Sequence, residues 1–337
     1  MEPPDREPGS LVGTGASLPL VSIVIPSYDH GRYLGAAIDS ILAQDYPRIE
    51  IIAIDDGSTD DSRDVLARYA GRIHWESQAN QGQAAALNRG WLMSRGDILG
   101  YLSADDLLLP GAVGRAVHCL QKNPDAALVY CDFNLIDPDS AVVRRIRAPE
   151  VAYSEMLGQL ICPPGPGAFF RRSAFEKAGL WDPGLRQMVD YEYWLRLGMH
   201  GRFVRIPEVL AAFRVHPGSQ TFAATSPARA DEPVRIIERY FQRENVPVGT
   251  QALRDRAFSA AYLVSAQLHL RGGNYGNGFA ALWRAFRLRP RNVFSLRSMR
   301  ILFNALFNRL GHRIVWGARR LSGTLTKHRL GTRSGRE

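Results

Sequence analysis

The stretch Gly96-Asp97-Ile98-Leu99-Gly100-Tyr101-Leu102-Ser103-Ala104-Asp105-Asp106 decides the fold. It begins at a turn and continues through mostly apolar residues, a pattern that indicates a buried strand. The strand ends on two adjacent carboxylates. Open α/β sheets bind ligands just outside the carboxyl ends of their strands, and carboxylate oxygens suit Mg²⁺ or Mn²⁺ that carries a substrate phosphate. A polar loop in which Asp106 caps the next helix is the alternative from these residues alone.

The same kind of segment recurs on both sides of this stretch. Apolar, β-branched runs predict strands, and apolar residues at helical spacing predict the helices between them. Strands are expected at 20–26, 49–54, 73–75, 98–102 and 126–131, and helices at 33–44, 62–69, 80–93 and 111–121. Such alternation implies parallel pairing with right-handed crossovers, which is the α/β class.

Composition agrees with a globular protein. The 337 residues are 45% hydrophobic, which is enough for a sizeable core. The three cysteines, Cys119, Cys131 and Cys162, form neither a disulfide framework nor a metal-ligand spacing, so a reducing compartment is expected. The N-terminus has no basic region that leads into an apolar one, and no apolar run reaches the roughly 18 residues of a membrane span. We therefore expect a cytoplasmic protein.

The net charge of +9 is unevenly distributed. From Arg284 to the end there are 14 Lys and Arg residues and one acid, Glu337, so the rest of the chain carries 28 basic and 32 acidic residues. A mildly acidic body thus precedes a strongly basic tail. Basic tails bind phosphate, either of lipids or of nucleic acid.

Changes in composition divide the chain into four parts. Residues 1–19 are rich in Pro, Gly and Ser and are predicted to be disordered. The α/β domain is expected over 20–224, a helical region over 225–321, and a basic disordered tail over 322–337. Within the helical region, helices at 253–270 and 279–288 resemble one tetratricopeptide-type hairpin, too short to be a solenoid alone.

Four separate strings together resemble a known family. They are Val21-Ser22-Ile23-Val24-Ile25-Pro26-Ser27-Tyr28, Ile54-Asp55-Asp56-Gly57-Ser58-Thr59-Asp60, Asn80-Gln81-Gly82 followed by Asn88-Arg89-Gly90, and the stretch that ends on Asp105-Asp106. In order and spacing they resemble family-2 glycosyltransferases of the GT-A fold, over roughly residues 20–216. The resemblance implies a Rossmann-like, mixed but mostly parallel sheet flanked by helices, here with a C-terminal helical appendage.

The resemblance assigns the nucleotide-sugar donor to loops that follow the strands. Tyr28 offers a flat face on which a base can stack, and Asp56 can accept a hydrogen bond from a uracil-like N–H, which implies a UDP- or dTDP-linked donor. Gly57 permits a close turn. The remaining contacts fall on Pro26, Asn80, Asn88 and Ser103, and on Arg214 and His216 in a loop near the diphosphate.

In the family, a divalent cation, Mg²⁺ or Mn²⁺, offsets the charge that develops on the leaving nucleoside diphosphate. Asp105 matches the last carboxylate of the family's DxD motif, and Asp106 is expected to take part. The first position of the motif is Ser103, where many relatives have Asp. This departure puts one ligand or ribose contact in doubt.

A second acidic motif lies in Gln187-Met188-Val189-Asp190-Tyr191-Glu192-Tyr193-Trp194-Leu195-Arg196-Leu197. Asp190 matches the catalytic base of inverting members, which takes the proton of the acceptor hydroxyl as its oxygen attacks the anomeric carbon. Glu192 is the second candidate for the base. A plain helix cap is the alternative function of Asp190. Position 189 is Val, where relatives often have Glu.

The basic segment 293–321 has aromatic and aliphatic residues at helical spacing among arginines. Such amphipathic helices lie on anionic membranes, so peripheral attachment to the inner face of the cell membrane is predicted. Packing on protein is the alternative.

The sequence therefore predicts an inverting glycosyltransferase that acts on a glycan or lipid-linked glycan in surface polysaccharide biosynthesis. The rival interpretation is a non-catalytic protein that retains the fold and binds nucleotide sugars or partners, supported by Ser103 alone. No nucleic-acid partner is expected, because the chain lacks a recognised motif for one.

Overall fold

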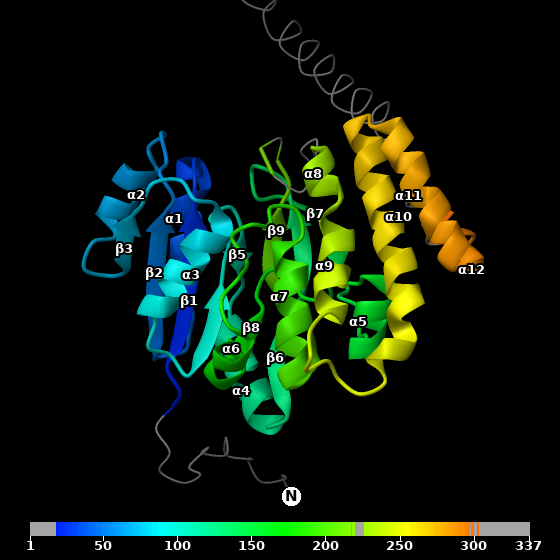
Figure 1. The fold of residues 1–337 in the computed structure, drawn as a ribbon. Coiled ribbons are helices and arrows are strands. Elements are labelled where there is room, and N and C mark those ends of the chain that lie inside the picture. Colours follow the sequence, from blue (N-terminus) through cyan, green and yellow to red (C-terminus); the bar gives the residue numbers. More distant parts are fainter. Residues whose placement is uncertain (1–17, 217, 220–225, 297, 300–301, 303–337) are drawn as a thin grey trace, which may run out of the picture.

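The computed structural model describes residues 18–216, 218–219, 226–296, 298–299 and 302. Within them lies a nine-stranded sheet in the order β3-β2-β1-β4-β8-β6-β9-β5, with β7 paired to β6 (Figure 1). The strands are β1 Val21–Ser27, β2 Ile49–Asp55, β3 His74–Ser77, β4 Ile98–Tyr101, β5 Leu107–Leu108, β6 Ala126–Ile136, β7 Val142–Ile146, β8 Phe169–Arg171 and β9 Arg202–Arg214.

The sheet is mixed, and its first four paired strands are parallel. β1 pairs in parallel with β2 and β4, and β2 with β3, because a helix returns the chain across the sheet between them. β8 joins β4 and β6 in antiparallel fashion, while β6 and β9 are parallel. The predicted α/β class with a Rossmann-like, mixed sheet is confirmed.

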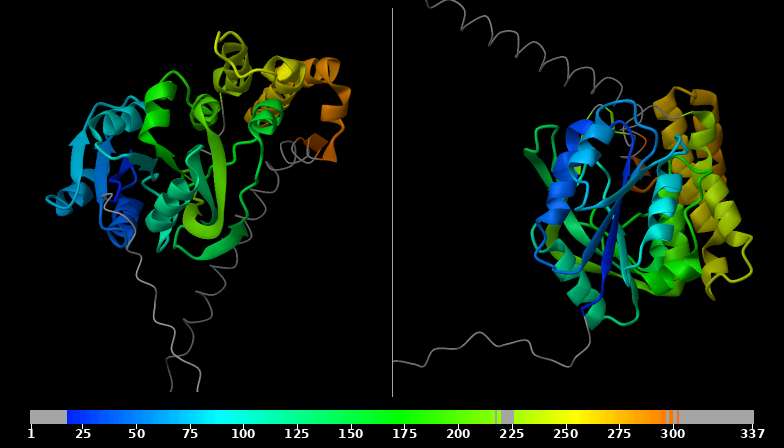
Figure 2. Two further views of the ribbon diagram at one scale, coloured as in Figure 1. Left: turned by 90° about the horizontal axis from the view of Figure 1, so that it is seen from below. Right: turned by 90° about the vertical axis from the view of Figure 1, so that its left-hand side faces the viewer.

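Helices cover both faces of the sheet (Figure 2). They are α1 Gly31–Leu42, α2 Ser62–Arg68, α3 Gln83–Met93, α4 Ala112–Lys122, α5 Tyr153–Gln159, α6 Arg172–Ala178 and α7 Val189–Leu197. Alternate residues of a strand point to opposite faces. In β1, Ile23 and Ile25 therefore pack with α1, α2 and α4, whereas Val24 packs with the cluster of α3, α6 and α7.

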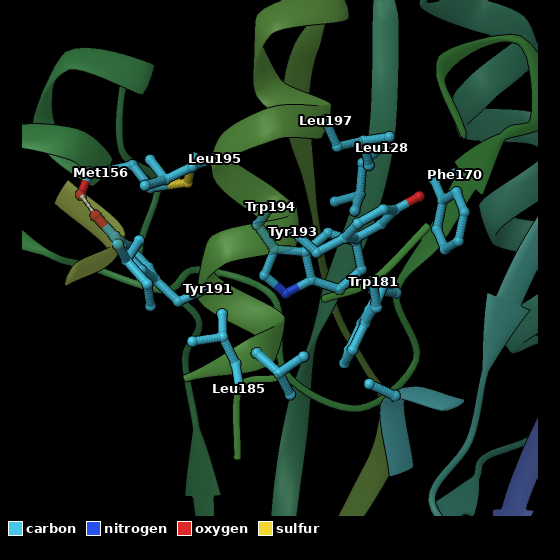
Figure 3. Packing of buried hydrophobic residues seen from close by; sticks show 14 of the residues in the cluster. Leu128, Met156, Phe170, Trp181, Leu185, Tyr191, Tyr193, Trp194, Leu195 and Leu197 are labelled. Atoms are coloured by element: carbon cyan, nitrogen blue, oxygen red, sulfur yellow. Dashed lines mark hydrogen bonds between the residues drawn. The ribbon is translucent and has the colours of Figure 1, made fainter. Parts of the chain in front are cut away.

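An aromatic core fixes α7 to the sheet. Trp181, Tyr193 and Trp194 are almost completely buried, and their rings contact one another and Phe170 of β8 at centroid distances of 5.3–6.1 Å (Figure 3). Aromatic pairs in this range add stability beyond their area burial. The predicted core position of Trp194, Leu195 and Leu197 is confirmed. The start of α7 is thereby held on a rigid support.

Among its described residues, the C-terminal region contains five α-helices: α8 Pro227–Ala230, α9 Glu232–Phe241, α10 Arg254–Gly272, α11 Tyr275–Leu288 and α12 Pro290–Val293. α10 and α11 form the expected hairpin at the side of the molecule (Figure 1). Ile236 and Ile237 of α9 and Ala257 and Ala261 of α10 belong to the same buried cluster as α7. The helical region thus shares its core with the α/β domain.

Two details differ from what the sequence predicts. The apolar runs at 203–206 and 209–215 predict two strands, whereas one long strand, β9, spans both; its pairing with β6 shifts register near Cys131 and Asp132. The pattern over 227–243 predicts one helix, which is divided at Asp231, because Pro233 cannot donate a hydrogen bond to the preceding turn and so occupies a helix start. The expected basic helix at 293–321 lies almost entirely outside the described residues.

In the part of the chain that the structure describes, no helix combines the length and the apolar character that crossing a membrane requires.

Candidate active site

A cavity of about 780 Å³ opens where β1, β2 and β4 end. Seven of the residues predicted to contact donor or metal line it: Pro26, Tyr28, Asp56, Asn80, Ser103, Asp105 and His216. They come from loops that follow different strands, and the parallel sheet brings these loops to one edge. Tyr28 is 42% exposed, so its ring face is accessible to a flat ligand. Ligand-sized clefts with few convergent polar groups are the usual form of a binding site.

Asp105 lies at the centre of a group of possible metal ligands. Its Oδ2 is 3.0 Å from Nε2 of His216 and 3.9 Å from Nε2 of His30. One ligand atom from each of the three residues lies within 4.8 Å of the others. The resemblance pointed to Asp105 and His216, whereas His30 was missed, although it directly follows the loop of Tyr28. A carboxylate with two imidazoles is a donor set that suits Mn²⁺ and other transition metals better than Mg²⁺.

Asp106 points away from that group. Its side chain is 3% exposed and its Oδ1 accepts a hydrogen bond from the backbone N–H of Arg214, at 2.9 Å. Burial, together with the neighbouring charge of Asp105, raises the pKa of the Asp106 carboxyl well above its ordinary value. The structure therefore gives Asp106 a role in joining the Asp105 turn to β9, and leaves its predicted part in metal binding without support.

Arg214 is likewise outside the cavity lining. Its guanidinium is buried and donates to the backbone carbonyls of Asp105, Asp137 and Pro138, at 2.8–3.2 Å, and to Ser140 Oγ. Through Nε and one terminal nitrogen, Arg214 thus joins the 137–140 turn to the Asp105 turn. The predicted phosphate contact finds no support in this arrangement.

Asp56 begins the loop after β2 and accepts hydrogen bonds from the loop that follows β3. Its carboxylate accepts hydrogen bonds from the side chain of Gln78 and from the backbone N–H groups of Gln81 and Gly82, at 2.6–2.9 Å. Gly57 has φ +79°, and a Cβ there would be 2.9 Å from the backbone nitrogen of Asn80. Only glycine allows this close approach without strain. The pair therefore shapes the wall that carries Asn80, and Asp56 itself faces the cavity.

Asn88 has a structural role. Its side chain accepts a hydrogen bond from the backbone N–H of Trp181 and donates to the carbonyl of the same residue, at 2.8 and 2.9 Å. This two-way bond ties α3 to the segment before α7, 93 residues further along the chain. The prediction of a donor contact at Asn88 is not supported, because Asn88 is not among the lining residues.

Asp190 lies in the first turn of α7 and is not itself a lining residue, but the adjacent Val189 lines the cavity. Its Oδ1 accepts from the backbone N–H of Tyr191 at 2.7 Å, and Cys162 Sγ lies 3.9 Å from its Oδ2. Burial raises the pKa of the Asp190 carboxyl, against the lowering effect of these hydrogen bonds. A raised pKa makes a carboxylate a stronger base. Glu192, the second candidate, is instead buried in an ion pair with Arg196 at 2.8 Å.

Two arginines that the sequence did not predict as site residues line the cavity from segments outside the sheet. Arg186 and Arg229 line the cavity, and the guanidinium of Arg186 lies against Gly82. Arg186 directly precedes the Asp190 motif, so its position in the sequence could have drawn attention to it. Arg229 lies in the helical region, which no motif linked to the site. Exposed guanidinium groups in a cleft favour anionic ligands such as phosphate.

Comparison with known proteins identifies the family. The model of "Glycosyl transferase family 2" matches residues 22–179. A glycosyltransferase of Rickettsia typhi, described as uncharacterized, is 35% identical over 217 residues, which are 61% of this chain and 67% of that protein. The chain belongs to glycosyltransferase family 2. A chondroitin synthase of Escherichia coli is 30% identical over 57% of this chain but only 28% of its own length.

Solved structures share the fold. The S. aureus protein TarS in complex with UDP-GlcNAc has a TM-score of 0.58 at 16% identity and covers 86% of this chain and 80% of its own. The mannosyltransferase PcManGT of Pyrobaculum calidifontis, in complex with GDP-Man and Mn²⁺, has a TM-score of 0.57 at 21% identity, over 90% and 84% of the two chains. At these identities the likeness concerns the fold alone.

Proposed function

We propose that this family-2 protein is an inverting hexosyltransferase that moves a sugar from a UDP- or dTDP-linked donor to a hydroxyl of a glycan or lipid-linked glycan. The observation that carries the proposal is the meeting of two chemical groups at one cavity. The Asp105 group lies at the strand ends, and Val189, which precedes Asp190 in the first turn of α7, lines the same cavity.

A divalent cation fits the first group. His30, Asp105 and His216 would hold it, since their ligand atoms lie within reach of a single ion. When bound, it offsets charge that develops on the leaving nucleoside diphosphate. The Mn²⁺ in the related mannosyltransferase is consistent with this assignment, and the two imidazoles favour Mn²⁺ over Mg²⁺. Ser103 lines the cavity beside this group, where its hydroxyl is available to the donor.

Asp190 would act on the acceptor. Its carboxylate takes the proton of the acceptor hydroxyl while that oxygen attacks the anomeric carbon from the side opposite the diphosphate, so the configuration inverts. The raised pKa of Asp190, caused by burial, supports this role, because the ionised carboxylate is then a better proton acceptor. On the donor side, Tyr28 would stack on the base and Asp56 would accept from its N–H.

The relatives and the charge of the cavity wall both bear on the class of acceptor. The relative named chondroitin synthase supports a glycan acceptor in surface polysaccharide biosynthesis, and the fold shared with TarS, solved with UDP-GlcNAc, supports a UDP-linked donor. Arg186 and Arg229 add positive charge to the cavity wall, which would favour an acceptor or donor group that bears phosphate or carboxylate.

Release of nucleoside diphosphate tests this proposal. The purified protein would be incubated with UDP-, dTDP- and GDP-linked sugars and Mn²⁺, after a thermal-shift screen of the same panel. We expect one UDP- or dTDP-linked sugar to raise the melting temperature and to be slowly hydrolysed, with inversion at the anomeric carbon by NMR. Binding without any hydrolysis or transfer would favour the rival interpretation, a non-catalytic nucleotide-sugar-binding protein.

An anionic membrane surface is the proposed second partner. Within the described residues, Tyr275, Phe279 and Trp283 recur at every fourth position of α11 and are 48%, 57% and 60% exposed. Exposed arginines accompany them, and no acid occurs between Asp255 and Glu337. Aromatic side chains beside arginines on a helix face favour the interface of an anionic bilayer. This helix precedes the segment 293–321 in which the sequence predicted membrane binding.

Vesicle flotation tests the membrane proposal. Full-length protein should float with phosphatidylserine-containing vesicles at low salt, and Phe279→Ala with Trp283→Ala should reduce the bound fraction several-fold. Leu92→Ala is the control, because Leu92 is 68% exposed on the distant helix α3. Protein that stays in the soluble fraction, or a double variant that loses self-association instead, would contradict the proposal.

A further inference from the structure

A buried carboxylate of the helical region holds the segment that leads to Asp190. Glu232, the first residue of α9, is 1% exposed. Its Oε1 accepts the backbone N–H of Arg186 at 2.9 Å, and its Oε2 accepts those of Gln187 and Met188, at 2.6 and 3.1 Å. Three consecutive amides thus converge on one carboxylate, a charge-assisted arrangement that is stronger than neutral hydrogen bonds.

These three amides lie at the point where the chain enters the site. Leu185, Arg186 and Val189 line the cavity, and Met188 is the residue that precedes α7. The side chain of Met188 cannot cap the helix, and Asp190 accepts from its neighbour Tyr191. The segment 186–188 therefore depends on Glu232, which lies more than 40 residues further along the chain, for a fixed conformation.

Glu232 is itself held in place by α10. The neighbouring Asp231 accepts from His269 Nε2 at 2.9 Å and from Ser265 Oγ at 3.3 Å. Ile236 and Ile237 bury α9 in the core shared with α7. A rigid support of this kind is what allows a second residue to determine the orientation of a reactive one.

We propose that Glu232 is a positioning residue of the transfer reaction, which sets the start of α7, and with it Asp190 and Arg186, against the bound substrates. The family model matches residues 22–179. Helices outside this range then complete the active site. The inference rests on the proposed function of Asp190 as the base. It adds that Glu232 is required for full turnover and not for nucleotide binding at the strand ends.

The test compares Glu232→Gln and Glu232→Ala with Glu238→Gln, an exposed glutamate on the same helix. Gln keeps one acceptor oxygen, so we expect turnover to fall about 10-fold in Glu232→Gln. In Glu232→Ala we expect a fall of about 10²-fold, the size of loss that a misplacement of about 1 Å can cause. The Kd for UDP with Mn²⁺, measured by calorimetry, should change less than twofold, and Glu238→Gln should resemble the unchanged protein.

Two readouts separate positioning from a loss of fold. Hydrogen exchange of the peptide that spans 184–190 should become several-fold faster in Glu232→Gln, while peptides from β1 and β4 stay unchanged. Tyr101 of β4 and Cys162 lie near the carboxyl of Asp190. A looser start of α7 would admit water to this carboxyl and lower its pKa, so the acid limb of the pH–rate profile should move to lower pH.

Unchanged exchange in 184–190, or faster exchange with unchanged turnover, would overturn the positioning role. A uniform rise in exchange over the whole protein in both variants would do the same, since it would mean a loss of stability only. Absence of turnover of any nucleotide sugar by the unchanged protein would instead contradict the proposed function, and the exchange result would still decide whether Glu232 holds the segment.

Discussion

The two walls of the cavity are built in different ways. The strand-end wall consists of loops directly after β1, β2 and β4, with Tyr28, Asp56 and Asp105. The helical wall consists of the segment before α7 and of α8, with Arg186 and Arg229. The first wall is placed by the sheet itself, because parallel strands end at one edge. The second is placed by contacts between segments far apart in the sequence, chiefly those of Glu232.

This difference suggests that the two walls have different functions. Binding of a nucleoside diphosphate needs groups that the sheet itself places at its strand ends. Recognition of an acceptor needs a wall that can vary, and segments outside the sheet can change without disturbing it. We therefore expect substitutions in the strand-end wall to affect donor binding, and substitutions in the helical wall to affect transfer.

The largest effect is expected for Asp105→Ala, in the strand-end wall. The change removes the carboxylate between His30 and His216, and a cation contributes several kcal/mol of charge stabilisation to such reactions, so turnover should fall about 10³-fold or more. Steady-state assays with Mn²⁺ would measure this. Asp64→Ala, an exposed carboxylate on α2, is the control. Turnover within a few-fold of the unchanged protein would show that Asp105 holds no catalytic cation.

The next effect concerns pH and the helical wall. A base must be deprotonated, and burial raises the pKa of Asp190. The rate should therefore fall tenfold per pH unit below an acid limb that lies above the ordinary aspartate value of about 4. The profile would be recorded at saturating Mn²⁺, because the affinity of a protein site for metal itself depends on pH. A rate that stays constant down to pH 4 would argue against Asp190 as the base.

The smallest effect is expected where the two walls are joined. Asn88→Ala removes both hydrogen bonds to the backbone of Trp181 and should lower the free energy of unfolding by about 2 kcal/mol. UDP affinity should stay within twofold, since Asn88 does not line the cavity. Urea unfolding and calorimetry would measure the two quantities, with Asn277→Ala on the exposed face of α11 as the control. A large loss of UDP affinity at unchanged stability would restore Asn88 as a donor contact.

Sequence patterns predicted backbone position, whereas side-chain direction depends on packing. Alternating strands and helices predicted the sheet, and Tyr28, Ser103 and Asp105, expected after strands, line the cavity. Asp106 is adjacent to Asp105 in the turn between β4 and β5, yet its carboxylate is buried against the backbone of Arg214. Arg214 was expected in a loop near the diphosphate, and its guanidinium donates to backbone carbonyls.

The helical wall was harder to predict for a physical reason. Glu232 and Arg229 carry no local signal, because the segment that Glu232 binds lies more than 40 residues away and a single carboxylate has no periodicity. Sequence patterns report spacing along one helix or strand. Pairings between elements depend on how the chain packs.

The most direct test of the account is Asp190→Asn, an isosteric change in the first turn of α7, next to the helical wall, that removes the proposed base and leaves the strand-end wall intact. UDP affinity in the presence of Mn²⁺ and turnover of the donor would be measured on the same preparation. We predict that the Kd for UDP changes less than twofold while turnover falls ~10²- to 10⁴-fold, the usual contribution of a general base. Turnover equal to that of the unchanged protein, or a parallel loss of UDP affinity, would contradict the assignment of Asp190 and the separation of the two walls.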